Sequence, residues 1–233
     1  MNTDIDMKVR GNGNVPAGEY NEITVRGKGR LFGTVRASLF SSSGTVSGEN
    51  IECIETFKSA GKSRFSGYVK SNFLRASGTI CCQSISAEEL SASGSLKCNE
   101  NTKADNLSVA GSFKVGGDIE AESAKVRGHI ICKGLVNAES LNIKFSSGLI
   151  GSIGGGKISV SREKTANPFS FHKNLSVSCA IEGDEISLER VECPRVTGKN
   201  VVIGKGCKID LLEYSESVKI SKKAKVLRVE KIK

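Results

Sequence analysis

The chain has 233 residues, and its 34 Lys and Arg outnumber its 25 Asp and Glu, which gives a formal net charge of +9. Gly is abundant at 26 residues, Pro is scarce at 3, and aromatic residues make up only 5%. This composition excludes disordered and collagen-like chains, which are rich in Pro, and it favours short strands around a narrow core.

Residues 1–22 are polar, and 1–20 carry no run of apolar residues, so we expect no signal peptide. We expect a flexible polar segment there. Nowhere does the chain approach the roughly 18 consecutive apolar residues that a membrane span needs. Because we expect no export, the eight cysteines indicate reduced thiols and a cytoplasmic protein.

From residue 23 onward the sequence repeats with a period of about 17 residues. Two columns lie four and two positions before a series of marker glycines, and they are apolar except for Ser42 and Ser59. This pair of columns continues through Ile158 and Val160 to Leu175 and Val177. The marker glycines keep one constant interval, except that Gly94 comes one position early: Gly27, Gly44, Gly61, Gly78, Gly94, Gly111 and Gly128.

Apolar and polar residues alternate within each repeat, which is the pattern of β-strands. Three short strands per repeat make one coil of a three-faced parallel β-helix, with equivalent residues stacked about 4.8 Å apart. We predict an all-β fold of about twelve such coils, of about 17 residues each. A right-handed helix is favoured, since 17 is not a multiple of the six-residue repeat of left-handed hexapeptide helices. The glycines are expected at corners, where a positive φ or a close approach of the backbone is needed.

The predicted organisation follows from this repeat. A regular β-helix spans 23–160, and a loop insertion that contains Pro168 interrupts it at 161–174. Further coils follow over 175–226. The last residues, 227–233, are expected to form a basic tail.

Residues that could carry catalysis or bind a cofactor are scarce. His129 and His172 have no acid or hydroxyl partner fixed by spacing, so we interpret both as surface residues. The cysteines have no zinc-site spacing, and Cys82, Cys98 and Cys132 share one inward column as small apolar fillers. The Gly-rich segment Gly151–Lys157 lacks the Ser or Thr of a phosphate loop. We therefore predict no enzyme activity, no cofactor, no metal and no small-molecule substrate.

The two ends of a parallel β-helix expose unpaired backbone groups, which a second copy can satisfy by adding its own strands. The sequence shows no amphipathic helix that would cover either end. The candidate polymerisation ends are apolar residues of the first and last predicted coils: Ile23, Val25, Leu31, Phe32, Val226, Leu227 and Val229.

Charge is segregated on the outward positions. We hypothesise side-by-side contacts between copies, basic edge to acidic edge, because stacked like charges repel one another unless a partner offsets them. The basic candidates are Lys28, Arg30, Lys62, Arg64, Lys97 and Lys114, and the acidic candidates are Glu88, Asp105, Glu122 and Glu139. Net charge alone is a weak argument for nucleic acid, which we do not expect as a partner.

Four segments resemble the bactofilins, polymer-forming cytoskeletal proteins of bacteria: Val25–Val35, Val109–Ile119, Ile181–Glu189 and Val196–Ile209. The last two look like the longer members found in Gram-positive bacteria, and the likeness covers about 23–226. It implies a right-handed β-helix that assembles end to end without nucleotide. It also implies a scaffold for cell-shape, cell-wall or motility machinery, often at the inner face of the membrane beside envelope proteins. The chain lacks the apolar N-terminal membrane motif.

The expected function is therefore a non-enzymatic scaffold that polymerises with itself. Two alternatives remain open. One is a β-helix adaptor of division or flagellar assembly that does not polymerise. The other is a β-helix acyltransferase or polysaccharide-cleaving enzyme, which would need a histidine or carboxylates converging in a groove.

Overall fold

A computed structural model describes residues 5–163 and 174–233. The chain divides into two compact units, Met1–Lys114 and Val115–Lys233, and each is treated by itself below. The described residues are almost all β-strand, without helix, and the strands pair in parallel as a β-solenoid with about 17 residues per turn. The prediction of a parallel β-helix is confirmed, and its handedness stays a prediction.

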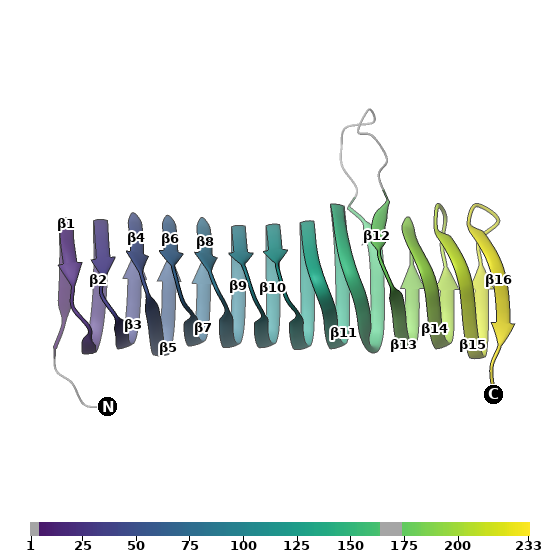
Figure 1. Cartoon of the computed structure of the whole chain (residues 1–233), viewed down its shortest axis with the longest axis horizontal. Coiled ribbons are helices and arrows are strands. Elements are labelled where there is room, and N and C mark those ends of the chain that lie inside the picture. Colours follow the sequence, from purple (N-terminus) through teal and green to yellow (C-terminus); the bar gives the residue numbers. More distant parts are fainter. Residues whose placement is uncertain (1–4, 164–173) are drawn as a thin grey trace. The chain divides into compact units, whose positions relative to one another are not determined.

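In the first unit, successive coils lie side by side in chain order (Figure 1). Its strands are β1 (Met7–Val15), β2 (Gly18–Leu31), β3 (Thr34–Ser42), β4 (Thr45–Gly48), β5 (Asn50–Ser59), β6 (Lys62–Phe65), β7 (Val69–Ala76), β8 (Thr79–Cys82), β9 (Ile85–Cys98) and β10 (Thr102–Val115), whose last residue belongs to the second unit.

The second unit has the same architecture (Figure 1). Its strands are β11 (Ile119–Arg162), β12 (Leu175–Val177), β13 (Ala180–Leu188), β14 (Val191–Ile203), β15 (Lys208–Ile220) and β16 (Lys225–Lys231). Most of the loop predicted at 161–174 lies outside the described residues, although Ser161 and Arg162 still belong to β11.

The backbone register varies around the sequence period. Gly18 of β2 pairs with Val35 of β3, which is one full repeat later. Met7 of β1 pairs with Ile23, so that offset is one position shorter. The register of β5 shifts against both of its neighbours, β3 and β7, between Cys53 and Thr56. This β-bulge inserts an extra residue into one coil, and such bulges turn side chains away from their regular direction.

The predicted flexible segment at 1–22 is wrong for most of its length. β1 and the start of β2 form a further coil, which brings the described residues to about 13 turns rather than twelve. The physical reason is the pairing of every residue of β1 with β2. The predicted tail at 227–233 is also wrong, because β16 extends to Lys231 and pairs with β15.

Close backbone approach explains the glycine column. A Cβ at Gly44 would lie 2.0 Å from the carbonyl oxygen of Gly27, and one at Gly61 would lie 2.1 Å from that of Gly44. Gly27, Gly94 and Gly111 also have φ between +121° and +132°, a region that only glycine enters readily. The expectation of a positive φ or a close approach of the backbone at these glycines is confirmed.

The core of the first unit stacks large rings in one column and alternates large and small residues in another. Phe40 and Phe57 stack with ring centroids 4.9 Å apart, and Phe65 meets Phe57 edge to face at 6.0 Å. Gly48 lies between Leu31 and Phe65, and a Cβ there would be 2.9 Å from the Leu31 Cβ. A core of this packing density therefore requires the small residue at each such position.

Candidate assembly surfaces

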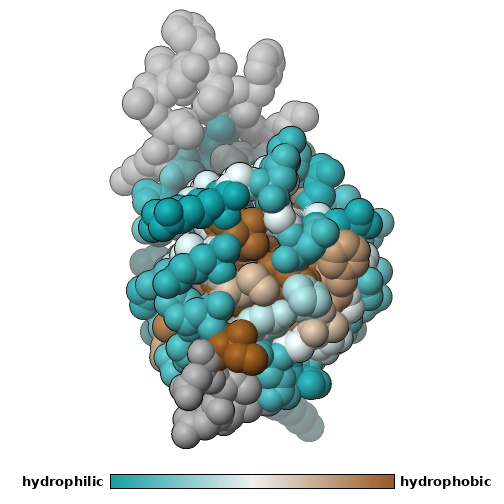
Figure 2. Space-filling view, turned by 90° about the vertical axis from the view of Figure 1, so that its left-hand side faces the viewer, coloured by the Kyte–Doolittle hydropathy of each residue, from teal (hydrophilic) through white to brown (hydrophobic). Residues whose placement is uncertain are grey.

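The N-terminal end of the first unit carries an unpaired strand edge. Among the described residues, β1 pairs with β2 alone, so its other edge has no partner strand. Figure 2 faces this end and shows apolar side chains near its centre with hydrophilic ones around them. Ile5 is 57% exposed and Met7 is half-buried, whereas Val9 and Val15 are buried.

The structure corrects the predicted N-terminal assembly residues. Ile23, Val25 and Leu31 are at most 2% exposed, because the residues of β1 lie over them in register. Phe32 is 40% exposed in the turn after β2, with the Arg30 guanidinium carbon 5.0 Å from its ring centroid. The residues of β1, which form this end, were not among the predicted candidates. The signal was present, since Gly11 precedes Gly27 by the same interval that separates Gly78 from Gly94.

The C-terminal end of the second unit exposes more large apolar side chains than the N-terminal end of the first unit. β16 pairs only with β15 among the described residues, so its outer edge is open. Leu227 is 66% exposed, Val229 44% and Ile232 37%, while Val226 is half-buried. Basic residues alternate with them, and residues 217–233 hold seven Lys and Arg against one acid, Glu230. The three C-terminal candidates thus lie on a strand whose outer edge has no partner strand among the described residues.

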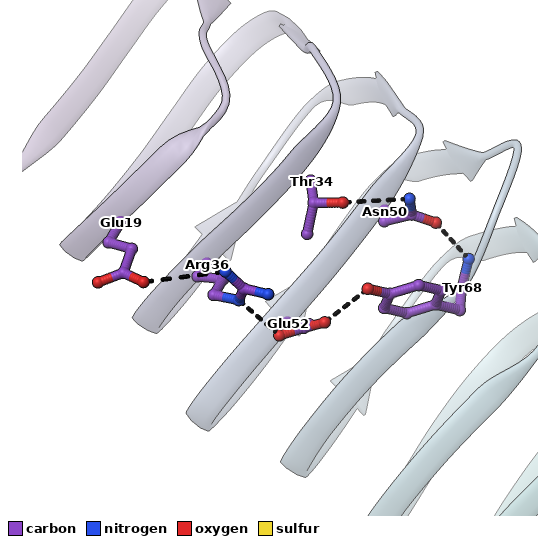
Figure 3. A network of polar contacts seen from close by, with 6 residues as sticks. All are labelled: Glu19, Thr34, Arg36, Asn50, Glu52 and Tyr68. Carbon is purple, nitrogen blue, oxygen red and sulfur yellow. Dashed lines mark hydrogen bonds and ion pairs between the residues drawn. The ribbon is translucent and has the colours of Figure 1, made fainter. Parts of the chain in front are cut away.

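On one side of the first unit, a ladder of polar contacts connects four coils (Figure 3). The Arg36 Nε donates to Glu52 at 2.9 Å, and Arg36 also lies 3.9 Å from Glu19. The Tyr68 hydroxyl donates to the other Glu52 oxygen at 2.5 Å. Asn50 joins the same coils, since its Oδ1 accepts from the Tyr68 backbone N–H at 3.1 Å.

This ladder stabilises the charged form of Glu52. The hydrogen bond from Tyr68, together with that from Arg36, lowers the pKa of Glu52 below its ordinary value, and the same carboxylate raises the pKa of Tyr68. Such a network ties neighbouring coils together and offers no free catalytic group. We therefore interpret this side as structural.

All the charged residues predicted to make lateral contacts are exposed. Their direction is therefore as expected, and the contact itself stays a prediction. On the same basic side of the first unit lies a shallow groove of about 520 Å³, lined by side chains that include Ser47, Arg64, Phe65, Cys81 and Lys97.

The residues considered for catalysis do not form a site in the described part of the chain. His129 Nδ1 lies 2.8 Å from Ser147 Oγ, a hydroxyl neighbour that spacing did not predict. His172 lies outside the described residues. The segment Gly151–Lys157 belongs to strand β11 and not to a loop before a helix, so the phosphate-loop reading is excluded. Among the described residues, no three His, Cys, Asp or Glu side chains are placed to hold a metal.

The inward cysteines are buried as predicted. Cys53, Cys82, Cys98 and Cys132 are at most 3% exposed. Burial raises the pKa of Cys132 to about 11, so its thiol stays protonated near neutral pH. Cys132 is therefore a packing residue rather than a nucleophile.

Comparison with known proteins adds one relative. The chain is 45% identical to "Uncharacterized protein YhbF" of Bacillus subtilis (strain 168) over 62 residues, which is 27% of this chain and 26% of that protein. The match thus covers about a quarter of either protein. No family model and no solved structure matches the chain. The described residues contain no helix long and apolar enough to cross a membrane.

Proposed function

We propose that the protein is a non-enzymatic cytoskeletal scaffold whose copies stack end to end into filaments without nucleotide. The observation that carries this proposal is the pair of unpaired strand edges, β1 in the first unit and β16 in the second, each beside exposed apolar side chains. A parallel strand of another copy would satisfy the free backbone groups and bury the apolar side chains at once.

The resemblance to bactofilins supports the same proposal and suggests its setting. A polymer of this kind would hold cell-shape, cell-wall or motility machinery in the cytoplasm, with its partners at the inner face of the membrane. The enzyme alternative has little support in the described residues, where the His129–Ser147 pair lines none of three surface grooves of the first unit.

The direct test is negative-stain electron microscopy of the full chain, purified without nucleotide, at micromolar concentration. Filaments are expected, and addition and removal of ATP or GTP should leave their length distribution unchanged. Discrete short particles at every concentration tested would refute polymerisation and would favour the adaptor.

A further inference from the structure

An edge of the first unit combines acidic and exposed apolar side chains. The backbone register stacks Glu22, Leu39, Thr56, Phe73 and Glu89 in one column across five coils. Leu39 is 38% exposed and Phe73 is 40% exposed, so a large part of each apolar side chain faces solvent. Acids therefore begin and end this column, and apolar residues occupy alternate coils between them.

The β-bulge in β5 adds to this edge. Its extra residue places Ile54, 44% exposed, and the exposed Glu55 beside Thr56. Ile54 thus lies on the coil between those of Leu39 and Phe73. We call Glu22, Leu39, Ile54, Glu55, Phe73 and Glu89 the acidic–apolar edge. Large exposed apolar side chains grouped among charges are typical of interaction surfaces.

A second column of the same unit has the complementary pattern. Arg30, Ser47, Arg64, Cys81 and Lys97 are stacked in register across five coils. Cations occupy every second coil, and the coils between them carry small side chains. The groove of about 520 Å³ opens at this column, with Ser47, Arg64, Cys81 and Lys97 in its lining. We call this column, together with the groove beside it, the basic groove.

The two surfaces match in charge and in spacing. Acids recur on the first at Glu22, Glu55 and Glu89, and cations recur on the second at Arg30, Arg64 and Lys97, each set spaced by two coils or about 9.6 Å. Where one surface presents Leu39 and Phe73, the other presents Ser47 and Cys81. None of these acids and cations forms an ion pair with another described residue of the chain.

We propose that two copies of this chain associate side by side, with the acidic–apolar edge of one copy seated in the basic groove of the other. Leu39 and Phe73 enter the groove beside Ser47 and Cys81, and the three acids face the three cations. Since the two surfaces differ, each copy keeps one of each free for a further neighbour, and the association is open. This contact does not depend on end-to-end stacking.

A charge exchange tests the proposal on the full chain. Glu55→Arg and Arg64→Glu each place like charges in contact and should raise the concentration at which copies associate laterally at least tenfold. The double variant, and an equal mixture of the two single variants, should restore association to within a few-fold of the original. Lys70→Glu serves as the control, since Lys70 is an exposed residue of β7 outside both surfaces. It should leave the concentration for lateral association unchanged.

Two readouts separate this contact from end-to-end stacking. Low-speed sedimentation and filament width in electron microscopy report lateral association, while high-speed sedimentation and filament length report stacking. If the chain forms no filaments, sedimentation velocity still detects laterally associated small oligomers. The lateral contact should weaken severalfold between about 0.05 and about 0.5 M salt, because salt screens surface charges beyond a few ångströms. Unchanged association in both single variants, or no recovery in the double variant, would overturn the proposal.

Discussion

Leu227 provides the sharpest test of end-to-end assembly, because it is the most exposed large apolar residue at the C-terminal end. It is 66% exposed on β16, the strand whose outer edge is open. Burying a whole leucine side chain is worth about 1.5–3 kcal/mol, so covering the exposed two thirds of Leu227 is worth about 1–2 kcal/mol. Since about 1.4 kcal/mol corresponds to a factor of ten, Leu227→Ala should raise the critical concentration for assembly by about 5- to 30-fold.

Leu227→Lys should have a larger effect. It removes the same apolar burial and adds a cation to an end where residues 217–233 already hold seven basic side chains. The assay is the critical concentration, obtained from the protein left in the supernatant after high-speed sedimentation. Thermal unfolding should change little, because Leu227 contributes little to the core of its own unit.

Leu149→Lys is the matched control. Leu149 is 44% exposed in β11, on the side of the same unit and away from the strand edge. Its substitution should leave the critical concentration within a few-fold of the original. If Leu227→Ala and Leu227→Lys both assemble at the original concentration, the junction does not include β16 and the reasoning from its open edge is wrong.

Three further predictions concern the fold itself. Gly61→Ala should lower the free energy of unfolding by about 2–3 kcal/mol, measured by chemical denaturation, because its Cβ would lie 2.1 Å from the Gly44 carbonyl oxygen. Phe57→Ala should cost about 3–5 kcal/mol in the same assay, since the fully buried ring stacks on Phe40. The contribution of Glu52 should be present above its ordinary pKa of 4.5 and decline as the pH falls through the lowered folded value. Glu52→Gln should therefore flatten the acid limb of a plot of melting temperature against pH, and an unchanged limb would contradict this assignment.

The interior of the fold could be predicted because its columns repeat. A residue such as Phe57 or Gly61 is constrained by the coil before it and the coil after it, so its type recurs at a nearly fixed interval. The end coils were harder to predict, since each has a neighbour on one side only. The first coil contains Gly11, Gly13 and Pro16 with few apolar residues, and β16 alternates apolar residues with Lys and Arg. Both patterns are typical of loops and tails as much as of edge strands.

The candidate surfaces could be predicted only in part. Outward charges follow from strand alternation, and Arg64 and Lys97 were found in this way. Ile54 could not be found, because a shift of one residue turns a side chain to the other face of a strand. The sequence period is an average over register offsets that vary by one position either way, and only the backbone shows that the bulge lies at Ile54 and Glu55.

Solubility explains only part of the pattern of the two outward columns. Spacing like charges every second coil relieves the repulsion between stacked neighbours, so the need for solubility alone accounts for the alternation of Arg30, Arg64 and Lys97 with small residues. It does not account for Leu39 and Phe73, because Ser or Thr would space the acids equally well, as Thr56 does in the same column. The exposed apolar surface at these positions lowers solubility, so a contact that covers it is the simplest physical reason for its presence.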